Sequence, residues 1–190
     1  MTDPAKIRRF EQNVLPHLDA AYNLARWLTC NAHDAEDVVQ EACLRAFKFI
    51  DGFRGGNVRC WLLTIVRHTC YTWLKQNRPS GVIHGFDEET HGVDESGALP
   101  GMFTAPDNDP ETLLSQHTAE KRLNQAIAGL PLEFREVLVL RELEDLSYKE
   151  IAGIAHIPIG TVMSRLARGR RLLQQSLVLS ETGKEPDHEL

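Results

Sequence analysis

Apolar side chains in the first 78 residues recur at the spacing of an α-helix and predict three helices. Over about residues 5–29 they step by three or four positions, as on one face of a helix. A second helix is predicted over about 34–50, where acidic residues in the first turn suit the positive end of the helix dipole. The third is predicted over 58–76 and has apolar residues on two sides. We therefore expect it to be contacted on two faces.

The second half of the chain continues the helical pattern. Asp109, Pro110 and Glu111 fit an N-cap, a first-position proline and a first-turn acid, and the helix they begin extends to about residue 128. Gly129 and Pro131 then interrupt the pattern, and a further helix is predicted over 132–143. No segment of the chain requires a strand. The predicted fold class is therefore all-α.

The last two predicted helices have the layout of a DNA-binding helix-turn-helix. Ser147 and Glu150 fit a capping box that opens a short helix over 147–155, and a turn at 156–160 leads into a final helix over 161–177. One face of the final helix carries small and apolar residues: Val162, Leu166, Gly169 and Leu173. The opposite face and its flanks carry hydroxyl and guanidinium groups: Thr161, Ser164, Arg165, Arg168, Arg170 and Arg171. Such groups suit phosphates and base edges. The alternative is a solvated basic face on an ordinary bundle helix.

The segment between the two helical halves predicts a flexible linker. Residues 79–110 are rich in Gly, Pro, Asp and Ser, and their few apolar residues show no lasting period. The sequence thus divides into a domain over 1–78, this acidic linker, a second domain over 111–179 and a tail over 180–190. A flexible linker is expected to leave the two domains in no fixed relation.

Charge and composition narrow the class of protein. The 190 residues carry a net charge of −6, yet residues 1–78 hold 11 Lys and Arg against 8 Asp and Glu. Residues 116–179 hold 9 basic against 7 acidic residues, so two mildly basic lobes remain compatible with nucleic acid. The longest apolar runs are far shorter than a membrane span, and no secretory signal is recognised. We expect a cytoplasmic protein without direct membrane insertion.

Catalytic and metal-binding patterns are not recognised in the sequence. The four cysteines, at 30, 43, 60 and 70, form no CxxC pair, so zinc spacing is missing. Reduced thiols are favoured over a redox switch in a cytosolic chain. The sequence offers no nucleophile–base pair or Gly-rich phosphate loop. We predict no catalytic residues, no metal and no cofactor.

Two stretches resemble a known family. LPLEFREVLVLRELEDLSYKEIAGIAHIPIGTVMSRLARGRRLL is similar to the promoter-recognition region of alternative bacterial sigma factors, and DAEDVVQEACLRAFKFIDGFRGGNVRCWLLTIVRH to their other conserved block. Their order and the compact size resemble the extracytoplasmic-function group of the sigma-70 family, whose members serve stress responses. The resemblance implies a non-enzymatic factor that binds core RNA polymerase and promoter DNA and is held by an anti-sigma factor. A stand-alone helix-turn-helix regulator or an enzyme, and control by expression level alone, are the alternatives.

The resemblance also implies roles for particular residues. Core polymerase is expected to contact Glu36, Asp37, Gln40, Glu41 and Arg45, beside Val39, Ala42, Ala46 and Ile50, which can face the lobe core. The alternative is that these charges only solvate the helix. The −10 promoter element is expected at Arg54, Asn57, Trp61, Arg67, His68, Tyr71 and Lys75. For Trp61 the alternative is packing in the core, and for Trp73 packing is favoured.

The −35 element is expected at Thr161, Ser164, Arg165, Arg168 and Arg171. The chain departs from the family pattern at three places. His68 and Thr72 stand where Asn and Asp are frequent, which leaves the base preference near −10 open. Met163 replaces a common lysine, and Arg165, Arg168, Arg170 and Arg171 could supply the missing phosphate contact.

Overall fold

The computed structural model describes residues 3–77 and 110–182, and every regular element in these two ranges is helical. The all-α prediction is therefore confirmed. The predicted linker over 79–110 lies outside the described residues except for Pro110, as does the expected cap Asp109. None of the described helices is long and apolar enough to cross a membrane.

The N-terminal lobe contains four helices rather than the three that were predicted. The segment expected as one helix over 5–29 forms α1 (Pro4–Asn13) and α2 (Leu18–Thr29), separated by the 3-10 turn η1 (Leu15–His17). Pro16 explains this break, because proline lacks the backbone N–H that an uninterrupted helix needs and its ring clashes with the preceding turn. Cys30, in the left-handed conformation, ends α2.

The other two helices of this lobe follow closely. Asn31 caps α3 (Ala32–Phe49) by accepting from the backbone N–H groups of His33 and Asp34 at 2.9 and 3.2 Å. The 3-10 turn η2 (Ile50–Gly52) and a loop with positive φ at two consecutive glycines lead to α4 (Val58–Asn77). α2, α3 and α4 pack against one another over a core of small and branched apolar side chains. It includes Leu24, Leu28, Ala42, Leu62 and Leu63.

The C-terminal lobe is built from α5 (Pro110–Ala128), α6 (Leu132–Leu138), α7 (Tyr148–Ala155) and α8 (Ile159–Thr182). The predicted helix over 132–143 ends in a π-helical turn, η3 (Val139–Leu143), where the Glu144 N–H donates to the Val139 carbonyl at 3.1 Å. The capping box of Ser147 and Glu150 is confirmed at the start of α7. α8 begins two residues earlier and ends five residues later than predicted.

Gly169 lets α8 approach α6. A Cβ at this position would lie 3.2 Å from the Leu138 Cδ1 atom and 3.4 Å from the Phe134 Cβ atom. The predicted apolar face of α8 is confirmed, since Val162, Leu166 and Leu173 are buried. α8 therefore packs closely on α6, and α7 packs on α8.

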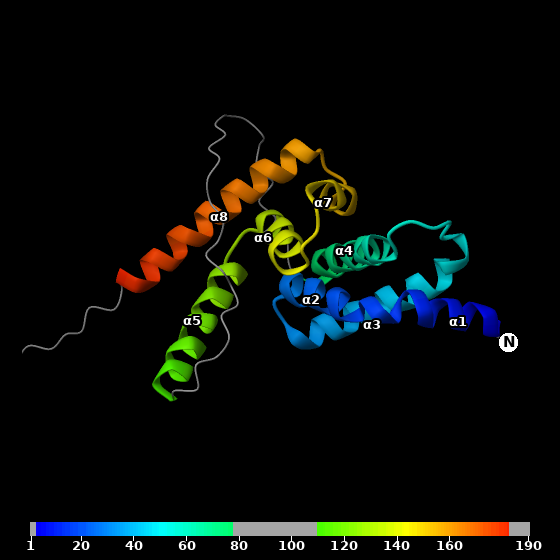
Figure 1. Cartoon of the computed structure of the whole chain (residues 1–190), viewed down its shortest axis with the longest axis horizontal. Coiled ribbons are helices and arrows are strands. Elements are labelled where there is room, and N and C mark those ends of the chain that lie inside the picture. Colours follow the sequence, from blue (N-terminus) through cyan, green and yellow to red (C-terminus); the bar gives the residue numbers. More distant parts are fainter. Residues whose placement is uncertain (1–2, 78–109, 183–190) are drawn as a thin grey trace, which may run out of the picture.

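The two lobes pack against each other, which corrects the expectation that they have no fixed relation. α4 contacts α7, and α2 contacts α6, so one hydrophobic core includes residues of both lobes. Figure 1 shows α6 and α7 lying against the α2 and α4 side of the N-terminal lobe, while α5 and the C-terminal part of α8 extend away from it. The expectation rested on linker composition, which carries no information about contacts between the lobes themselves.

Candidate nucleic-acid interface

The first turns of α8 present the polar residues that were predicted to meet DNA. Ser164 and Arg171 are exposed, while Thr161, Arg165 and Arg168 are half-buried. The Ser164 hydroxyl donates to the Thr161 carbonyl at 3.1 Å, which fixes its rotamer at the helix surface. Hydroxyl and guanidinium groups at the start of the second helix of a helix-turn-helix can reach base edges and phosphates.

Two apolar residues at this end of α8 also belong to the surface: Met163, which the sequence marked as the replacement of a common lysine, and Ile159, which it did not mark. Ile159 is 46% exposed and Met163 is 51% exposed. A helix start that offers both apolar and polar groups can contact thymine methyl groups as well as polar base edges. The sequence did not indicate Ile159, because it predicted that residue in the turn over 156–160, whereas α8 begins there.

Arg170 has a structural role instead of the DNA contact considered for it. Its guanidinium donates twice to one Glu142 carboxylate oxygen, at 2.7 and 3.1 Å. Glu142 belongs to η3, so this ion pair fixes α8 to the segment that precedes the helix-turn-helix. Arg170 is therefore poorly placed to make the phosphate contact that is lost because Met163 stands in place of a common lysine.

The seven residues predicted for the −10 element do not form one open surface. Four of them contact the C-terminal lobe. The Arg67 guanidinium forms an ion pair with Glu136, and the Tyr71 hydroxyl donates to the same carboxylate at 3.0 Å. The Asn57 amide donates to Glu150 at 2.8 Å, and the His68 ring stacks on His156 at 5.3 Å between centroids.

The remaining three residues lie outside this contact. Arg54 and Lys75 are exposed, and Trp61 is half-buried, with its ring centroid 5.1 Å from that of Phe53. Trp73 is partly buried against the core, in line with the packing role favoured for it. Arg59 was not singled out from the sequence, but it forms an ion pair with Glu144 of the other lobe.

Burial shifts the pKa values of the two residues that Arg67 contacts, Glu136 and Tyr71. Glu136 is fully buried, and burial raises the pKa of its carboxyl, while Arg67 and Tyr71 counteract part of that effect. Burial also raises the pKa of the Tyr71 hydroxyl, and the Glu136 charge adds to the rise. The Arg67 guanidinium lies 4.5 Å from the centroid of the Tyr71 ring. The three side chains thus form one connected cluster between the lobes.

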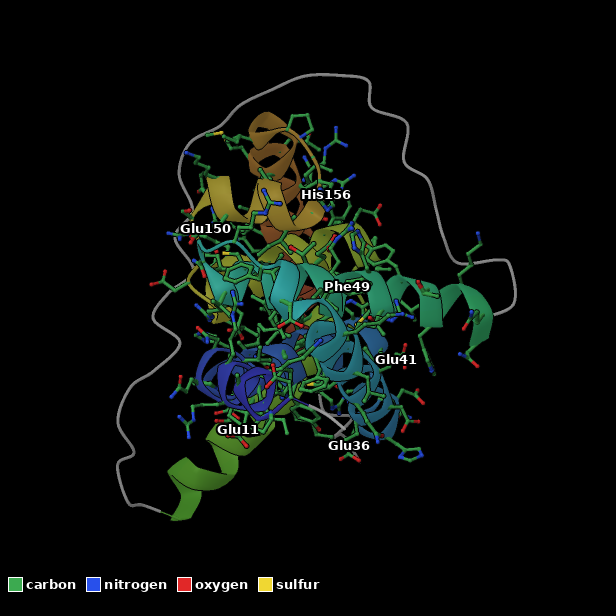
Figure 2. The ribbon with its side chains drawn as sticks, turned by 90° about the vertical axis from the view of Figure 1, so that its right-hand side faces the viewer. Glu11, Glu36, Glu41, Phe49, Glu150 and His156 are labelled. Carbon is green, nitrogen blue, oxygen red and sulfur yellow. The ribbon has the colours of Figure 1, made fainter. Side chains whose placement is uncertain are left out.

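The acidic surface of α3 lies away from this cluster. Glu36, Asp37, Gln40 and Glu41 are exposed, and Arg45 pairs with Glu41 at 2.8 Å. On the inner side Ala42, Ala46 and Ile50 are fully buried, Val39 is partly buried, and Val38, which the sequence did not single out, is also in the core. Figure 2 shows Glu36 and Glu41 in the lower half of the view, away from Glu150 and His156 in its upper half.

Two large apolar side chains on this helix are also exposed. Leu44 is 62% exposed and Phe49 is 58% exposed. Exposed apolar groups beside charged ones are typical of a protein-binding surface. The sequence pattern had not indicated them, because helical periodicity alone does not show which apolar residues remain uncovered.

The cysteines and the possible metal ligands form no further site in the part of the chain that the structure describes. All four cysteines are free, and Cys70 is buried. Among the residues that the structure describes, no three or more His, Cys, Asp or Glu side chains form a group able to hold a metal ion.

Comparison with known families places both lobes. The Sigma-70 region 2 family matches residues 14–79, and the Sigma-70, region 4 family matches residues 120–173. Among curated proteins, the ECF RNA polymerase sigma factor SigW of Bacillus subtilis is 32% identical over 84% of this chain and 83% of its own length. The ECF RNA polymerase sigma-E factor of Escherichia coli is 34% identical over 76% of this chain and 74% of its own length.

A further relative is longer than this chain. The ECF RNA polymerase sigma factor SigE of Mycolicibacterium smegmatis is 34% identical over 92% of this chain, which spans 64% of the length of that protein. Among solved structures, the sigma factor RpoE in complex with the anti-sigma factor NepR from Bartonella quintana matches 88% of this chain and 96% of its own, with 28% identity and a TM-score of 0.64. CnrH in complex with the cytosolic domain of CnrY shares the fold, with 22% identity over 91% of this chain and 90% of its own and a TM-score of 0.61.

Proposed function

The chain belongs to the sigma-70 family, within its extracytoplasmic-function group, and from this we propose that it binds core RNA polymerase and directs transcription initiation from specific promoters. The observation that carries the proposal is the presence, in family order, of a region 2 lobe and a region 4 lobe on one chain. A stand-alone helix-turn-helix regulator would not need the first lobe.

Core polymerase is proposed to dock on the outer surface of α3. The contacts are Glu36, Asp37, Gln40, Glu41 and Arg45, with exposed Leu44 and Phe49 beside them. The apolar pair supports docking over a purely solvating role, because solvation of a helix gives no reason to expose two large apolar side chains.

Promoter DNA is proposed to bind at two places. The −35 element is read by Thr161, Ser164, Arg165, Arg168 and Arg171, at the start of α8. The melted −10 element is held by Arg54, Asn57, Trp61, Arg67, His68, Tyr71 and Lys75, on α4 and the loop before it. Guanidinium and amide donors with nearby aromatic rings are the groups that hold single strands and phosphates.

The family also supports proposals on the catalysis, localisation and regulation of this protein. We propose that the chain acts in the cytoplasm and catalyses no reaction of its own, the polymerase supplying the chemistry. An anti-sigma factor is the proposed regulator, and the Bartonella structure, in which the related sigma factor is in complex with NepR, supports this over control by expression alone.

The test is reconstitution with purified core RNA polymerase. The full chain and core polymerase are mixed and separated by size-exclusion chromatography, and the polymerase fractions are assayed for the chain. The proposal predicts stoichiometric co-elution. Elution of the whole chain at its own size, at micromolar concentrations of both partners, would favour a stand-alone DNA-binding regulator.

A further inference from the structure

α1 contacts the chain at the place where α3 ends and the connection to α4 begins (Figure 1). Lys6 forms an ion pair with Asp51 of η2 at 2.7 Å and also donates to the Lys48 carbonyl, in the last turn of α3, at 3.3 Å. Arg9 donates to the Phe53 carbonyl, directly after η2, at 2.7 Å. Two cations of one helix therefore bind the segment that leads out of α3.

α1 is anchored to the N-terminal lobe by contacts other than these two cations. The Phe10 ring meets the Phe47 ring of α3 edge-on, with 5.4 Å between the ring centroids. Val14, directly after the helix, is fully buried in the core. The side chains of Lys6 and Arg9 thus extend from a helix that is already fixed in place, and their bonds are additional to its packing.

Residues 53–57 connect η2 to α4, and both ends of this 53–57 loop are held. At the first end the Phe53 N–H donates to the Ile50 carbonyl at 3.1 Å, while Arg9 binds the Phe53 carbonyl. At the other end the Asn57 side-chain oxygen accepts from the Cys60 N–H at 3.1 Å, as an N-cap residue of α4 does. The loop is therefore tied to α1 and η2 on one side and to α4 on the other.

The middle of the 53–57 loop depends on these two ends. Gly55 and Gly56 have φ values of 100° and 110°, a conformation that residues with a side chain rarely adopt. Within the part of the chain that the structure describes, a Cβ at either glycine would meet no atom within 4 Å apart from its neighbours in sequence. Arg54 is exposed. Because packing does not hold the two glycines, the backbone at Phe53 and Asn57 sets the direction of Arg54.

Phe53 also connects the loop to α4. Its ring centroid lies 5.1 Å from that of Trp61, with the ring planes tilted by 40°. A shift of the Phe53 backbone would therefore move both Arg54, which follows it directly, and the ring that packs on Trp61. Arg54 and Trp61 are two of the seven residues proposed for the −10 element.

We infer that Arg9 and Lys6 are positioning residues for the −10 element: they fix the start of the 53–57 loop from α1, and the loop then presents Arg54 and Trp61 to the melted strand in one geometry. The inference rests on the proposed function and assigns α1 a part in it. A loop that is ordered before binding gives higher affinity and sharper discrimination, because less binding free energy is lost in ordering it.

The acceptors favour this role over simple attachment of α1 to the lobe. Two of the three acceptors are main-chain carbonyls, those of Lys48 and Phe53, so the bonds fix the backbone itself. The other alternative is that the two cations attract DNA phosphates by charge alone. A test must therefore separate the geometry of Arg9 from its charge.

Three substitutions in α1 of the full chain make that separation. Arg9→Met removes the bond to the Phe53 carbonyl. Arg9→Lys keeps a cationic donor on a long side chain, so it should restore most of the effect. Arg8→Met is the matched control, because it removes the same charge from the neighbouring exposed position of the same helix.

Discrimination between single strands by the holoenzyme is the first measurement. The wild-type holoenzyme enriches its preferred strand from a pool of short single strands of randomised sequence, with core polymerase alone as the reference. Fluorescence anisotropy then gives the affinity of each variant holoenzyme for that strand and for a scrambled one. We expect Arg9→Met to lower the ratio of the two affinities about fivefold or more, and Arg8→Met to leave it within about twofold.

Hydrogen–deuterium exchange of the free chain is the second measurement, and it needs no strand. Peptides that cover the 53–57 loop should exchange faster in Arg9→Met than in the wild type, Arg8→Met or Arg9→Lys, because one end of the loop is released. Peptides of α3 should exchange as in the wild type, which shows that the lobe remains folded. If Arg9→Met does not fold, Lys6→Met replaces it, since Lys6 binds the same end of the loop.

Equal discrimination and equal loop exchange in Arg9→Met and Arg8→Met would overturn the inference. Faster exchange with unchanged discrimination would also overturn it, because the hold on the loop would then not matter to the strand. Lost discrimination with unchanged exchange would do the same, because Arg9 would then act on DNA directly. All three outcomes leave the proposed function standing. Failure of the wild type to bind core polymerase, or to enrich any strand, would instead refute the proposed function.

Discussion

Arg67 of α4 forms an ion pair with Glu136 of α6, a residue 69 positions further along the chain whose side chain is fully buried. The pair joins the two lobes, and Tyr71 shares the same carboxylate. Removal of one partner leaves the other in an environment that penalises an isolated charge. The energies of the two side chains should therefore be coupled.

A double-mutant cycle measures that coupling. Arg67→Met and Glu136→Gln are each expected to lower the free energy of unfolding in urea, by about 1–3 kcal/mol, because each leaves the other side chain without its partner. The double variant should lose clearly less than the sum of the two single losses. Additive losses would show that the pair contributes nothing specific to the contact between the lobes.

Local features of the fold could be predicted from the sequence. The capping box of Ser147 and Glu150 joins residues three positions apart, and the apolar face of α8 follows from helical spacing alone. The Arg67–Glu136 pair could not be predicted in this way, because no local pattern links residues on opposite sides of a long linker. The break at Pro16 was missed for another reason, since the apolar spacing continues across the 3-10 turn.

The sequence could predict which residue types make up the candidate site. It could not predict which of these side chains are paired with other residues in the folded protein. Glu36, Asp37, Gln40 and Glu41 of α3 are exposed, as a docking surface requires. Arg170 was grouped with the other arginines of α8, but its pairing with Glu142 depends on how η3 packs. Tertiary contacts of this kind decide which members of a basic helix remain available to a ligand.

Substitutions at the start of α8 should weaken recognition of the −35 element. Ser164→Ala and Arg168→Ala each remove a polar group from the DNA-facing side, at an expected cost of about 1–3 kcal/mol on the preferred duplex. Competition with random duplex measures the specific part. Arg170→Ala is the matched control on the same helix, expected to reduce stability without changing discrimination. Equal losses of affinity for preferred and random duplexes would show that Ser164 and Arg168 contact phosphates and not bases.

Substitutions on α3 should weaken polymerase binding without unfolding the lobe. Asp37→Ala with Gln40→Ala alters two exposed side chains and leaves the core untouched. We expect at least a tenfold loss of affinity for core polymerase, measured by fluorescence anisotropy, with an unchanged circular dichroism melt. Gln12→Ala with Asp19→Ala, on exposed positions of α1 and α2, makes the same chemical change elsewhere and should bind normally. Normal binding by both variants would mean that the docking surface lies elsewhere.

Thiol reactivity provides a pH-dependent probe of the lobe contact. Burial and the nearby Glu150 carboxylate raise the pKa of Cys60 to about 11, and burial raises that of Cys70 to about 12. Because the thiolate is the reactive form, Cys60 should be alkylated at pH 8 about a hundredfold more slowly than a thiol of ordinary pKa, and its rate should rise with pH.

Glu150→Gln removes the charge that adds to the rise in the Cys60 pKa, so it should speed alkylation of Cys60 and leave buried Cys70 unaffected. Mass spectrometry of peptides after timed iodoacetamide treatment measures both sites in one sample. Fast alkylation of Cys60 in the wild type would contradict its placement beside Glu150 at the lobe contact.

Transcription by reconstituted holoenzyme tests the central claim most directly. Core RNA polymerase, with and without the full chain, is incubated with fragmented DNA of the native genome, and the 5′ ends of the transcripts are sequenced. We predict transcripts that start at discrete positions only when the chain is present, share upstream elements near −10 and −35, and become fewer with Arg168→Ala. A pattern of 5′ ends identical to that of core polymerase alone, from samples in which the chain is bound to core polymerase, would contradict it.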